Sequence, residues 1–258
     1  MKNIRLTGAV ALITLLTVTG CKRTLYPYPD NPLTNYYIPL EVGKYAIYQL
    51  DSLNFYYYGQ LDTLTRYLAK DSVEKSFVDN AGHPSWVVVR YLSPATGPIV
   101  WTASQTNTVT PFSQSIEDVE NNFRFIKLAY PMKDSFTWNG NSYLPTNPYQ
   151  DIFTFSTPAN INLNTWTYTY LNVNQPFTAG GKTYDSTLTV LQYNDSTNVP
   201  IVVDTLFASR TYWSETYAKH IGLVFRHTSI WEYQPPTPNG QSGYKIGFEV
   251  TMTLLDHN

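Results

Sequence analysis

Apolar and polar positions alternate with a period of two through most of the chain after residue 35. The clearest run lies at residues 244–254, where every second residue is apolar: Tyr244, Ile246, Phe248, Val250, Met252 and Leu254. A second run alternates threonine with the aromatic residues Trp166, Tyr168 and Tyr170. Because successive side chains of a strand point to opposite faces, this period predicts strands with one buried face.

The same alternation predicts many short strands and little helix. After residue 21, no window of about 12 residues shows a convincing period of 3.6. We expect further strands near residues 44–50, 62–70, 85–92, 99–109, 116–129, 186–193, 203–213 and 221–232.

Turn-forming residues separate these segments. Asn-Gly or Gly-Gly pairs at 139–140, 180–181 and 239–240 accept the positive φ of tight hairpins, and other turn signals lie at 80–82 and 94–98. Short strands joined by hairpins predict an all-β fold with little helix, built as an antiparallel meander. A half-barrel, a barrel and a sandwich all fit this pattern.

The first 21 residues have the three parts of an export signal. Lys2 and Arg5 give a positive start, residues 6–16 are apolar, and small residues precede Cys21. The apolar run is shorter than the roughly 20 residues that a membrane-spanning helix needs. Residues 16–21 resemble the bacterial lipobox, which implies cleavage between Gly20 and Cys21 and a lipid on the Cys21 thiol.

Cys21 is the only cysteine of the chain, so it has no partner for a disulfide, and lipidation accounts for it. An ordinary secretory peptide followed by an incidental thiol is the alternative. We therefore predict a signal peptide at residues 1–20, a lipidated cysteine with an extended tether containing three prolines at 21–35, and a single antiparallel β domain at 36–258.

Charge and composition narrow the range of partners. The chain has 17 basic and 19 acidic residues, a formal net charge of -2. Neither nucleic acid nor anionic lipid is an expected partner at this balance. Charged residues make up only 14% of the chain while aromatic residues reach 16%, which suits a sheet with a largely neutral outer face.

Three stretches are similar to motifs of uncharacterised outer-membrane lipoproteins of Bacteroidota. Residues 37–48 read YIPLEVGKYAIY, like the opening Y-x-P-L-x-V-G-x-Y-W-x-Y of those proteins, with Ala46 in the place of the usual Trp. The second stretch joins residues 127–131 (KLAYP) to 138–141 (WNGN), and the third is residues 215–224 (ETYAKHIGLV), where His220 replaces the usual Gly. The resemblance implies an envelope location and a β architecture but no activity.

Six short segments resemble the O-glycosylation pattern of the same phylum, although Asp-Ser and Asp-Thr are equally ordinary in turns. They start at Asp51, Asp62, Asp71, Asp185, Asp195 and Asp204.

Histidine and serine offer no evident catalytic or metal site. His83 and His257 lie in a turn and near the terminus, while His220 and His227 are seven residues apart, which on a continuous strand places them on opposite faces. No Gly-x-Ser-x-Gly elbow occurs, and Gly180-Gly181-Lys182 is better explained as a hairpin than as a phosphate cradle. We predict no catalytic residue, no bound metal and no cofactor.

A glycosidase needs a pair of carboxylates, and the candidates are Glu117, Asp118, Glu120, Glu215 and Glu232. The first two should face opposite sides of a strand, and solvated edge charges are the simpler expectation for all five.

Three aromatic clusters could face a ligand or pack in the core, and core packing is the simpler expectation. The clusters are Tyr56-Tyr57-Tyr58, Trp138 with Tyr143, and Tyr212-Trp213 with Tyr217.

These features predict an outer-membrane lipoprotein, held by the lipid on Cys21 and facing the periplasm, whose β domain is a binding or structural module without enzymatic activity. The residues after Cys21 lack the acidic run that resembles the surface-export signal of Bacteroidota, which favours the periplasmic side, although exposure at the cell surface stays open. Alternatives are a surface glycan-binding module, a carrier of lipid or another hydrophobic ligand, and a hydrolase. The partner, whether small molecule, glycan or protein, is not predicted.

Overall fold

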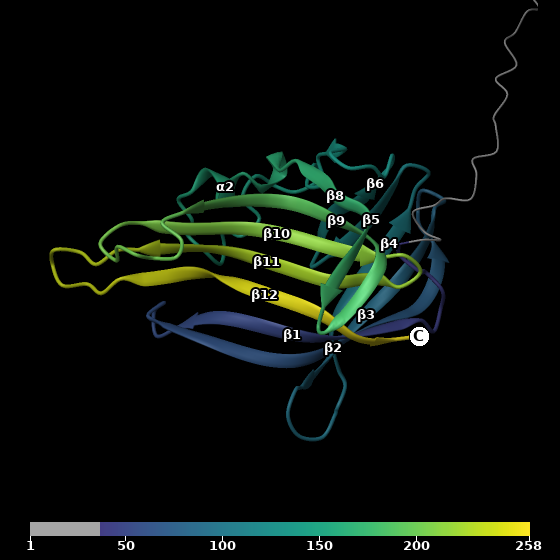
Figure 1. The fold of residues 1–258 in the computed structure, drawn as a ribbon, viewed down its shortest axis with the longest axis horizontal. Helices are drawn as coiled ribbons and strands as arrows, with labels where there is room; N and C mark the ends of the chain where they lie inside the picture. The colour runs from purple at the N-terminus through teal and green to yellow at the C-terminus, as the bar shows by residue number, and fades with distance from the viewer. Residues whose placement is uncertain (1–36) are drawn as a thin grey trace, which may run out of the picture.

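The computed structural model describes residues 37–258, whose regular secondary structure is almost entirely β-strand (Figure 1). The predicted signal peptide, Cys21 and the tether lie outside these residues. The strands are β1 (Tyr45–Tyr56), β2 (Leu61–Val78), β3 (Pro84–Pro94), β4 (Thr102–Pro111), β5 (Ser115–Glu120), β6 (Phe123–Ala129), β7 (Thr137–Trp138), β8 (Tyr168–Ala179), β9 (Lys182–Thr197), β10 (Ala208–Ala218), β11 (Gly222–Gln234) and β12 (Tyr244–His257). Helix is limited to α2 (Pro158–Ile161) and the 3₁₀ turn η1 (Leu163–Thr165).

The twelve strands of residues 37–258 form one sheet in the order β6-β5-β4-β3-β2-β1-β12-β11-β10-β9-β8-β7. Every strand pair is antiparallel, so the predicted all-β antiparallel meander is confirmed. The first and last strands pair with each other at the middle of the sheet, as at Leu50 and Met252. The sheet curls into a nearly closed barrel, which decides among the three shapes that the sequence left open.

A few hydrogen bonds join the two edges of the sheet. The N–H of Ile126 in β6 donates to the carbonyl of Gly140 at 2.8 Å, and Nε1 of Trp138 in β7 donates to the carbonyl of Ile126 at 2.8 Å. The Tyr170 hydroxyl of β8 accepts from the N–H of Ala129 at 2.8 Å and donates to its carbonyl at 2.7 Å. These backbone and side-chain hydrogen bonds close the seam, by which we mean the gap between the two edges of the sheet that no strand pairing of residues 37–258 spans.

One predicted strand is two. Residues 116–129 form β5 and β6, joined by a turn at Asn121 and Asn122 with φ of 50° and 64°. Asparagine tolerates this left-handed conformation better than most residues, so the Asn-Asn pair was the available signal.

The predicted turns differ in outcome. Gly180 and Gly181, with φ of 57° and 75°, form the β8–β9 hairpin as predicted. Asn139-Gly140 is not a hairpin, because it leads from β7 into a long segment at 139–167. Gly140 is needed for packing instead, since a Cβ there would lie 2.2 Å from the ring of Tyr168.

Other predicted strands are present with different ends. The strand expected at 99–109 begins at Thr102, and the one expected at 203–213 begins at Ala208. β2 and β9 are longer than expected because pairing with both neighbours extends them past residues 70 and 193. None of the helices in residues 37–258 combines the length and the apolar character needed to cross a membrane.

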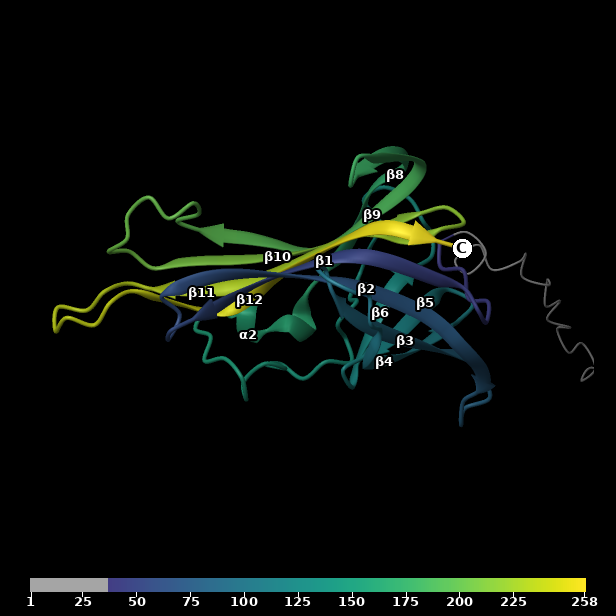
Figure 2. The same cartoon turned by 90° about the horizontal axis from the view of Figure 1, so that it is seen from below.

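Figure 2 shows the β8–β9 hairpin on one side of the β9–β12 wall and α2 on the other. The hairpin tip crosses the outer face of β12, where Lys182 Nζ donates to the carbonyl of Leu255 and Gly180 lies against Thr253. The segment that carries α2 instead covers the inner face. The barrel interior is thus enclosed by the sheet and by residues 139–167.

The interior is filled by inward-facing side chains, among them Trp166, Tyr168 and Tyr170, each no more than 1% exposed. In β12, Met252 and Leu254 are buried as the alternation predicts. Phe248 and Val250 share their face but stay half-buried. They line a chamber rather than a packed core.

Candidate functional site

Strand register brings opposite charges together inside the barrel. Glu215 in β10 is the direct cross-strand partner of Arg226 in β11, and Asp71 in β2 is the partner of Arg90 in β3. Side chains at such positions point to the same face, close enough to pair.

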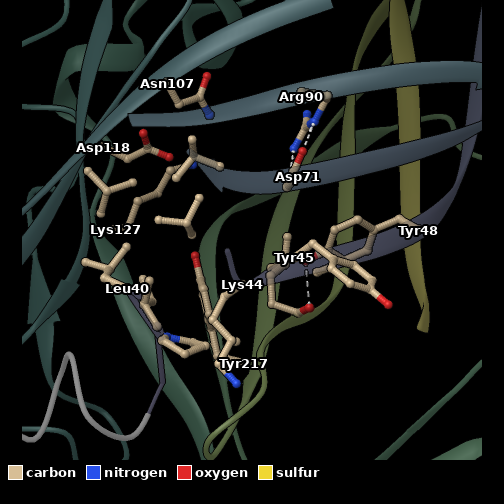
Figure 3. Close-up of a pocket in the computed structure, with 18 of the residues that line it drawn as sticks. Leu40, Lys44, Tyr45, Tyr48, Asp71, Arg90, Asn107, Asp118, Lys127 and Tyr217 are labelled. Carbon is tan, nitrogen blue, oxygen red and sulfur yellow. Dashed lines mark hydrogen bonds and ion pairs between the residues drawn. The ribbon is translucent and has the colours of Figure 1, made fainter. Parts of the chain in front are cut away.

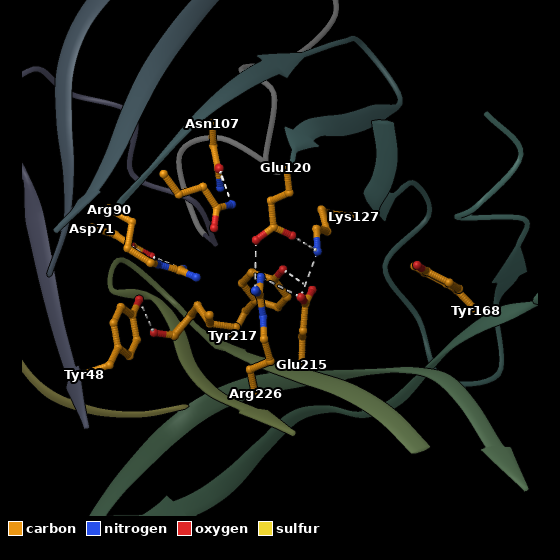
Figure 4. A network of polar contacts seen from close by, with 12 residues as sticks. Tyr48, Asp71, Arg90, Asn107, Glu120, Lys127, Tyr168, Glu215, Tyr217 and Arg226 are labelled. Carbon is orange, nitrogen blue, oxygen red and sulfur yellow. Dashed lines mark hydrogen bonds and ion pairs between the residues drawn. The ribbon is translucent and has the colours of Figure 1, made fainter. Parts of the chain in front are cut away.

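Four buried side chains form a closed ring of ion pairs, which we call the charge ring: Glu120, Lys127, Glu215 and Arg226 (Figure 4). Arg226 lies 2.9 Å from Glu120 and 2.8 Å from Glu215, while Lys127 lies 3.0 Å from Glu120 and 2.9 Å from Glu215. The free oxygen of Glu215 accepts a 2.6 Å hydrogen bond from the Tyr217 hydroxyl. Every carboxylate oxygen of the ring has a partner.

The pairing keeps the ring charged in spite of its burial. Burial by itself would raise the pKa of Glu120, but Arg226 and Lys127 hold it well below its usual value. The same two cations outweigh burial at Glu215 and lower its pKa as well. Removing one partner from such a network leaves an uncompensated buried charge, so each of the four residues depends on the other three for its stability.

A separate ion pair lies beside the ring. Arg90 contacts Asp71 through two hydrogen bonds of 2.6 Å, a fork-to-fork geometry that is strong and directional. Burial would lower the pKa of Arg90, and Asp71 raises it instead. Tyr48 packs next to this pair and donates its hydroxyl to the carbonyl of Leu223 at 3.0 Å.

Asp118 differs from the other interior acids. Burial, which is the largest cause, and repulsion from Glu120 together raise the pKa of Asp118 to about 8. Its Oδ1 is buried and has no hydrogen-bond partner among residues 37–258. Asp71, Asp118, Glu120 and Glu215 make four acids against the three cations Arg90, Lys127 and Arg226. A proton on Asp118 balances the charges of these seven side chains.

Two cavities flank the charge ring, and Arg90, Glu120 and Arg226 line both. The end cavity has a volume of about 130 Å³ and lies where residues 38–46 enter the barrel. Figure 3 shows Asp118, Asn107 and Lys127 on one side of it and Leu40, Lys44 and Tyr217 on the other.

The second cavity, which we call the chamber, has a volume of about 490 Å³. Aromatic and aliphatic side chains make up much of its wall: Phe123, Phe125, Tyr149, Ile152, Trp213, Phe248, Val250 and Met252. Its polar lining includes Glu120 and Arg226 of the charge ring together with Arg90, Gln105, Asn121, Asp151 and Thr228.

The structure brings no two histidines together. His83 lies 3.3 Å from Asp79 in the β2–β3 turn, and His227 lies 3.1 Å from Glu249. His220 is in the β10–β11 turn with φ of 63°, just before the strand expected at 221–232, so it does not share a continuous strand with His227. Residues 37–258 contain no group of three metal-ligating side chains.

The expectation of solvated acids is wrong. Glu120, Glu215 and Glu232 are 9%, 2% and 0% exposed. Glu117 and Asp118 do face opposite sides of β5, and Glu117 pairs with Arg124 at 3.1 Å. Glu232 accepts from the N–H groups of residues 156 and 157 and from the Asn160 amide, so it fixes the segment that carries α2.

Sequence reasoning also missed the cations of the interior. Phe123, Phe125 and Lys127 occupy alternate positions of β6, and Val88 and Arg90 do the same in β3. A charged residue at a position that alternation assigns to the buried face was the signal that could have found them.

The aromatic clusters divide between core and surface. Trp213 and Tyr217 are 8% and 4% exposed, and Trp138 stacks among Phe136, Tyr168 and Tyr170, so these rings pack as expected. Tyr56, Tyr57 and Tyr58 are 51%, 73% and 95% exposed at the β1–β2 turn. Tyr143 is also exposed and lies over Arg124.

The six Asp-Ser and Asp-Thr segments also divide. Thr63, Ser196 and Thr205 are exposed, whereas Asp71 belongs to the interior ion pair.

Comparison with known proteins assigns no family. No family model matches the sequence, and no curated protein matches it. Among solved structures, the chain is similar to a protein of Bacteroides fragilis that is described as exported and as having a YmcC-like fold. The two share 9% sequence identity and a TM-score of 0.40, over 87% of this chain and 99% of the other. A likeness this distant assigns neither a family nor a function, and the resemblance to Bacteroidota lipoproteins stays a prediction.

Proposed function

We propose that this chain is an exported, lipid-anchored envelope protein whose barrel is a non-catalytic binding module for a small, largely apolar molecule. The observation that carries the proposal is the chamber. Its volume of about 490 Å³ lies within the range of roughly 300–1,000 Å³ that is typical of small-molecule sites.

The lining of the chamber suits an apolar or aromatic ligand. Phe123, Tyr149 and Phe248 are only half-buried although they face the interior. Tyr149 and Phe248 meet edge to face with ring centroids 5.7 Å apart, and Phe123 lies beside Tyr149 at 6.4 Å. A ligand in the chamber would cover these rings, which favours binding by the hydrophobic effect.

The charge ring favours binding over catalysis. The acid of a glycosidase needs a second carboxylate that is free to act as base or nucleophile. Asp118 has the raised pKa of an acid, but the carboxylates of Glu120 and Glu215 are each engaged at both oxygens. The ring therefore serves better as the floor of a binding site.

The anchor half of the proposal rests on residues 1–21. A lipidated Cys21 would carry two or three acyl chains, and each buried methylene contributes about 0.8 kcal/mol to membrane binding. Two or more chains hold a protein at a bilayer stably, with the barrel outside it.

A surface glycan-binding role is the second candidate, favoured by Tyr56, Tyr57 and Tyr58. These rings are consecutive at a turn rather than aligned on a flat face, so they form a weaker platform for sugar stacking than the chamber does for an apolar ligand.

Binding of the uncharged fluorophore N-phenyl-1-naphthylamine to the purified mature protein tests the chamber. Val250→Phe places a larger side chain in the chamber and should weaken binding at least tenfold. Val89→Phe is the matched control, because Val89 alternates with the inward-facing Val88 and Arg90 and so points out of the barrel. It should bind like the original protein.

All three proteins are measured in the same detergent, so partition of the fluorophore into micelles is common to them. Circular dichroism checks that each variant is folded. Equal signals from the three proteins, or no saturable binding by the original one, would remove the chamber as a binding site.

A further inference from the structure

We propose that the end cavity is a second binding site, which takes a small neutral molecule or group with an apolar body and an oxygen acceptor, recognised by a hydrogen bond from the Asp118 carboxyl group. This site lies across the charge ring from the chamber, and its test does not depend on ligand binding in the chamber.

The walls of the end cavity are apolar and its floor is polar. Leu40, Val73, Val88, Val109 and Leu223 surround it. Its volume of about 130 Å³ is several times the roughly 10–15 Å³ that one water molecule needs. The cavity can therefore hold a ring or chain of a few carbon atoms.

Two buried polar atoms of the residues that line this cavity have no hydrogen-bond partner among residues 37–258: Oδ1 of Asp118 and Nε of Arg226. Arg226 is held by Glu120 and Glu215 through its other nitrogens, whereas Asp118 forms no ion pair within residues 37–258. Asn107 next to it accepts from Gln105, and Lys127 is held by the charge ring. The Asp118 side chain stays partly accessible because it lines the cavity (Figure 3). A buried polar group without a partner costs free energy, so a ligand that supplies the missing hydrogen bond is favoured.

The charged groups around Asp118 decide its protonation. Titratable groups face it from every neighbouring element: Glu120 on β5, Lys127 on β6, Glu215 and Tyr217 on β10, Arg226 on β11, Asp71 and Arg90 on β2 and β3, and Lys44 before β1. Burial and repulsion from Glu120 raise the pKa of Asp118 to about 8, so its protonated form predominates at neutral pH. A protonated carboxyl group is a hydrogen-bond donor.

Charge balance also selects a neutral ligand. The charge ring and the Asp71–Arg90 pair already compensate their own charges, so a charged ligand would add a buried charge to them. A cation would lie among Lys44, Lys127, Arg90 and Arg226. A carbonyl, ether or hydroxyl oxygen can accept from Asp118 without this cost.

Carbon-13 NMR of the mature protein, labelled at the side-chain carboxyl carbon of aspartate, tests the site. The signal of Asp118 is the one that Asp118→Asn removes. It should titrate near pH 8, and cyclohexanone should shift it at pH 6.5 with a dissociation constant at least tenfold lower than at pH 9.5.

Two variants separate this site from the chamber and from unfolding. In Asp118→Asn the amide stays a neutral donor, so cyclohexanone, followed by saturation-transfer NMR, should bind equally at both pH values. Val250→Phe, which alters the chamber, should leave binding in the end cavity unchanged.

Three results would overturn the inference: titration of Asp118 near pH 4, no response to cyclohexanone, or tighter binding of cyclohexanecarboxylate than of cyclohexanone. The last result would assign recognition to Lys44. None of them bears on binding in the chamber.

Discussion

Lys127 shows how a single residue acquires its role from the fold. In the sequence it lies between apolar neighbours of a strand and resembles a solvated surface lysine. In the barrel its ammonium group contacts Glu120 and Glu215 at 3.0 and 2.9 Å and lies over the ring of Phe125. Burial alone would lower the pKa of Lys127 and favour its neutral form, but Glu120 and Glu215 raise the pKa instead.

Replacing Lys127 by methionine should lower the free energy of unfolding by about 3–5 kcal/mol, because two buried carboxylates then share one cation, Arg226. Urea denaturation measures the change. Lys75→Met, at an exposed position of β2, is the control and should change stability by no more than about 0.5 kcal/mol. Adding Glu215→Gln to the first variant should recover part of the loss.

The pH dependence of this loss has a definite sign. Glu120 and Glu215 have folded pKa values below 4.5, so they stabilise the fold above that pH and lose the contribution as the pH falls. The difference between the original protein and Lys127→Met should therefore be larger at pH 7 than at pH 4. Similar stabilities of Lys127→Met and Lys75→Met would contradict the structural role of the charge ring.

At the scale of the elements, the seam between β6 and β8 depends on one hydroxyl. The Tyr170 hydroxyl both accepts from and donates to the backbone of Ala129. Ala129 is in the edge strand β6, which pairs with β5 on one side and with no strand of residues 37–258 on the other. The alternation Trp166, Tyr168, Tyr170 predicts that Tyr170 points inward, but not which strand it meets.

Tyr170→Phe should lower the free energy of unfolding by about 1–3 kcal/mol, because it leaves the N–H and carbonyl of buried Ala129 without a partner. Amide hydrogen exchange at Ala129 should accelerate. Tyr193→Phe is the control, since Tyr193 stacks on Trp166 at 4.7 Å and its hydroxyl makes no hydrogen bond within residues 37–258. Unchanged exchange at Ala129 would mean that the seam closes without this hydroxyl.

At the scale of the whole molecule, the chain enters the barrel beside the end cavity. Tyr37 is 2% exposed, Pro39 packs near Gly222, and residues 38–40 line the cavity. The N–H of Tyr45 donates to the Asn258 side chain at 2.7 Å, so both ends of the described chain meet there. A lipid on Cys21 would attach the barrel to the membrane by this end.

The anchor is tested by the intact mass of the mature protein produced in a Bacteroidota host. A chain that begins at Cys21 with added lipid mass is expected, and Cys21→Ala should lose that mass and leave the membrane fraction. Further sugar mass would support glycosylation at the Asp-Ser and Asp-Thr segments. A mature chain without lipid would contradict the anchor and indicate a secreted protein with a free thiol.

The sequence by itself determined the features that depend on neighbours along the chain. Alternation over residues 244–254 gives a strand with one buried face, Gly180-Gly181 gives a hairpin, and the absence of a 3.6-residue period leaves little room for helix. These follow from backbone geometry, which a few consecutive residues suffice to express.

Only the tertiary structure decided how the sheet closes into a barrel and which charged side chains pair inside it. Lys127 and Glu215 are 88 residues apart, and Glu120 and Arg226 are 106 apart, yet each pair lies in contact. Whether an acid in a strand is solvated or buried depends on which distant strand supplies its cation. The curvature of the sheet determines which distant strands face each other, and no pattern of neighbouring residues in the sequence predicts this curvature.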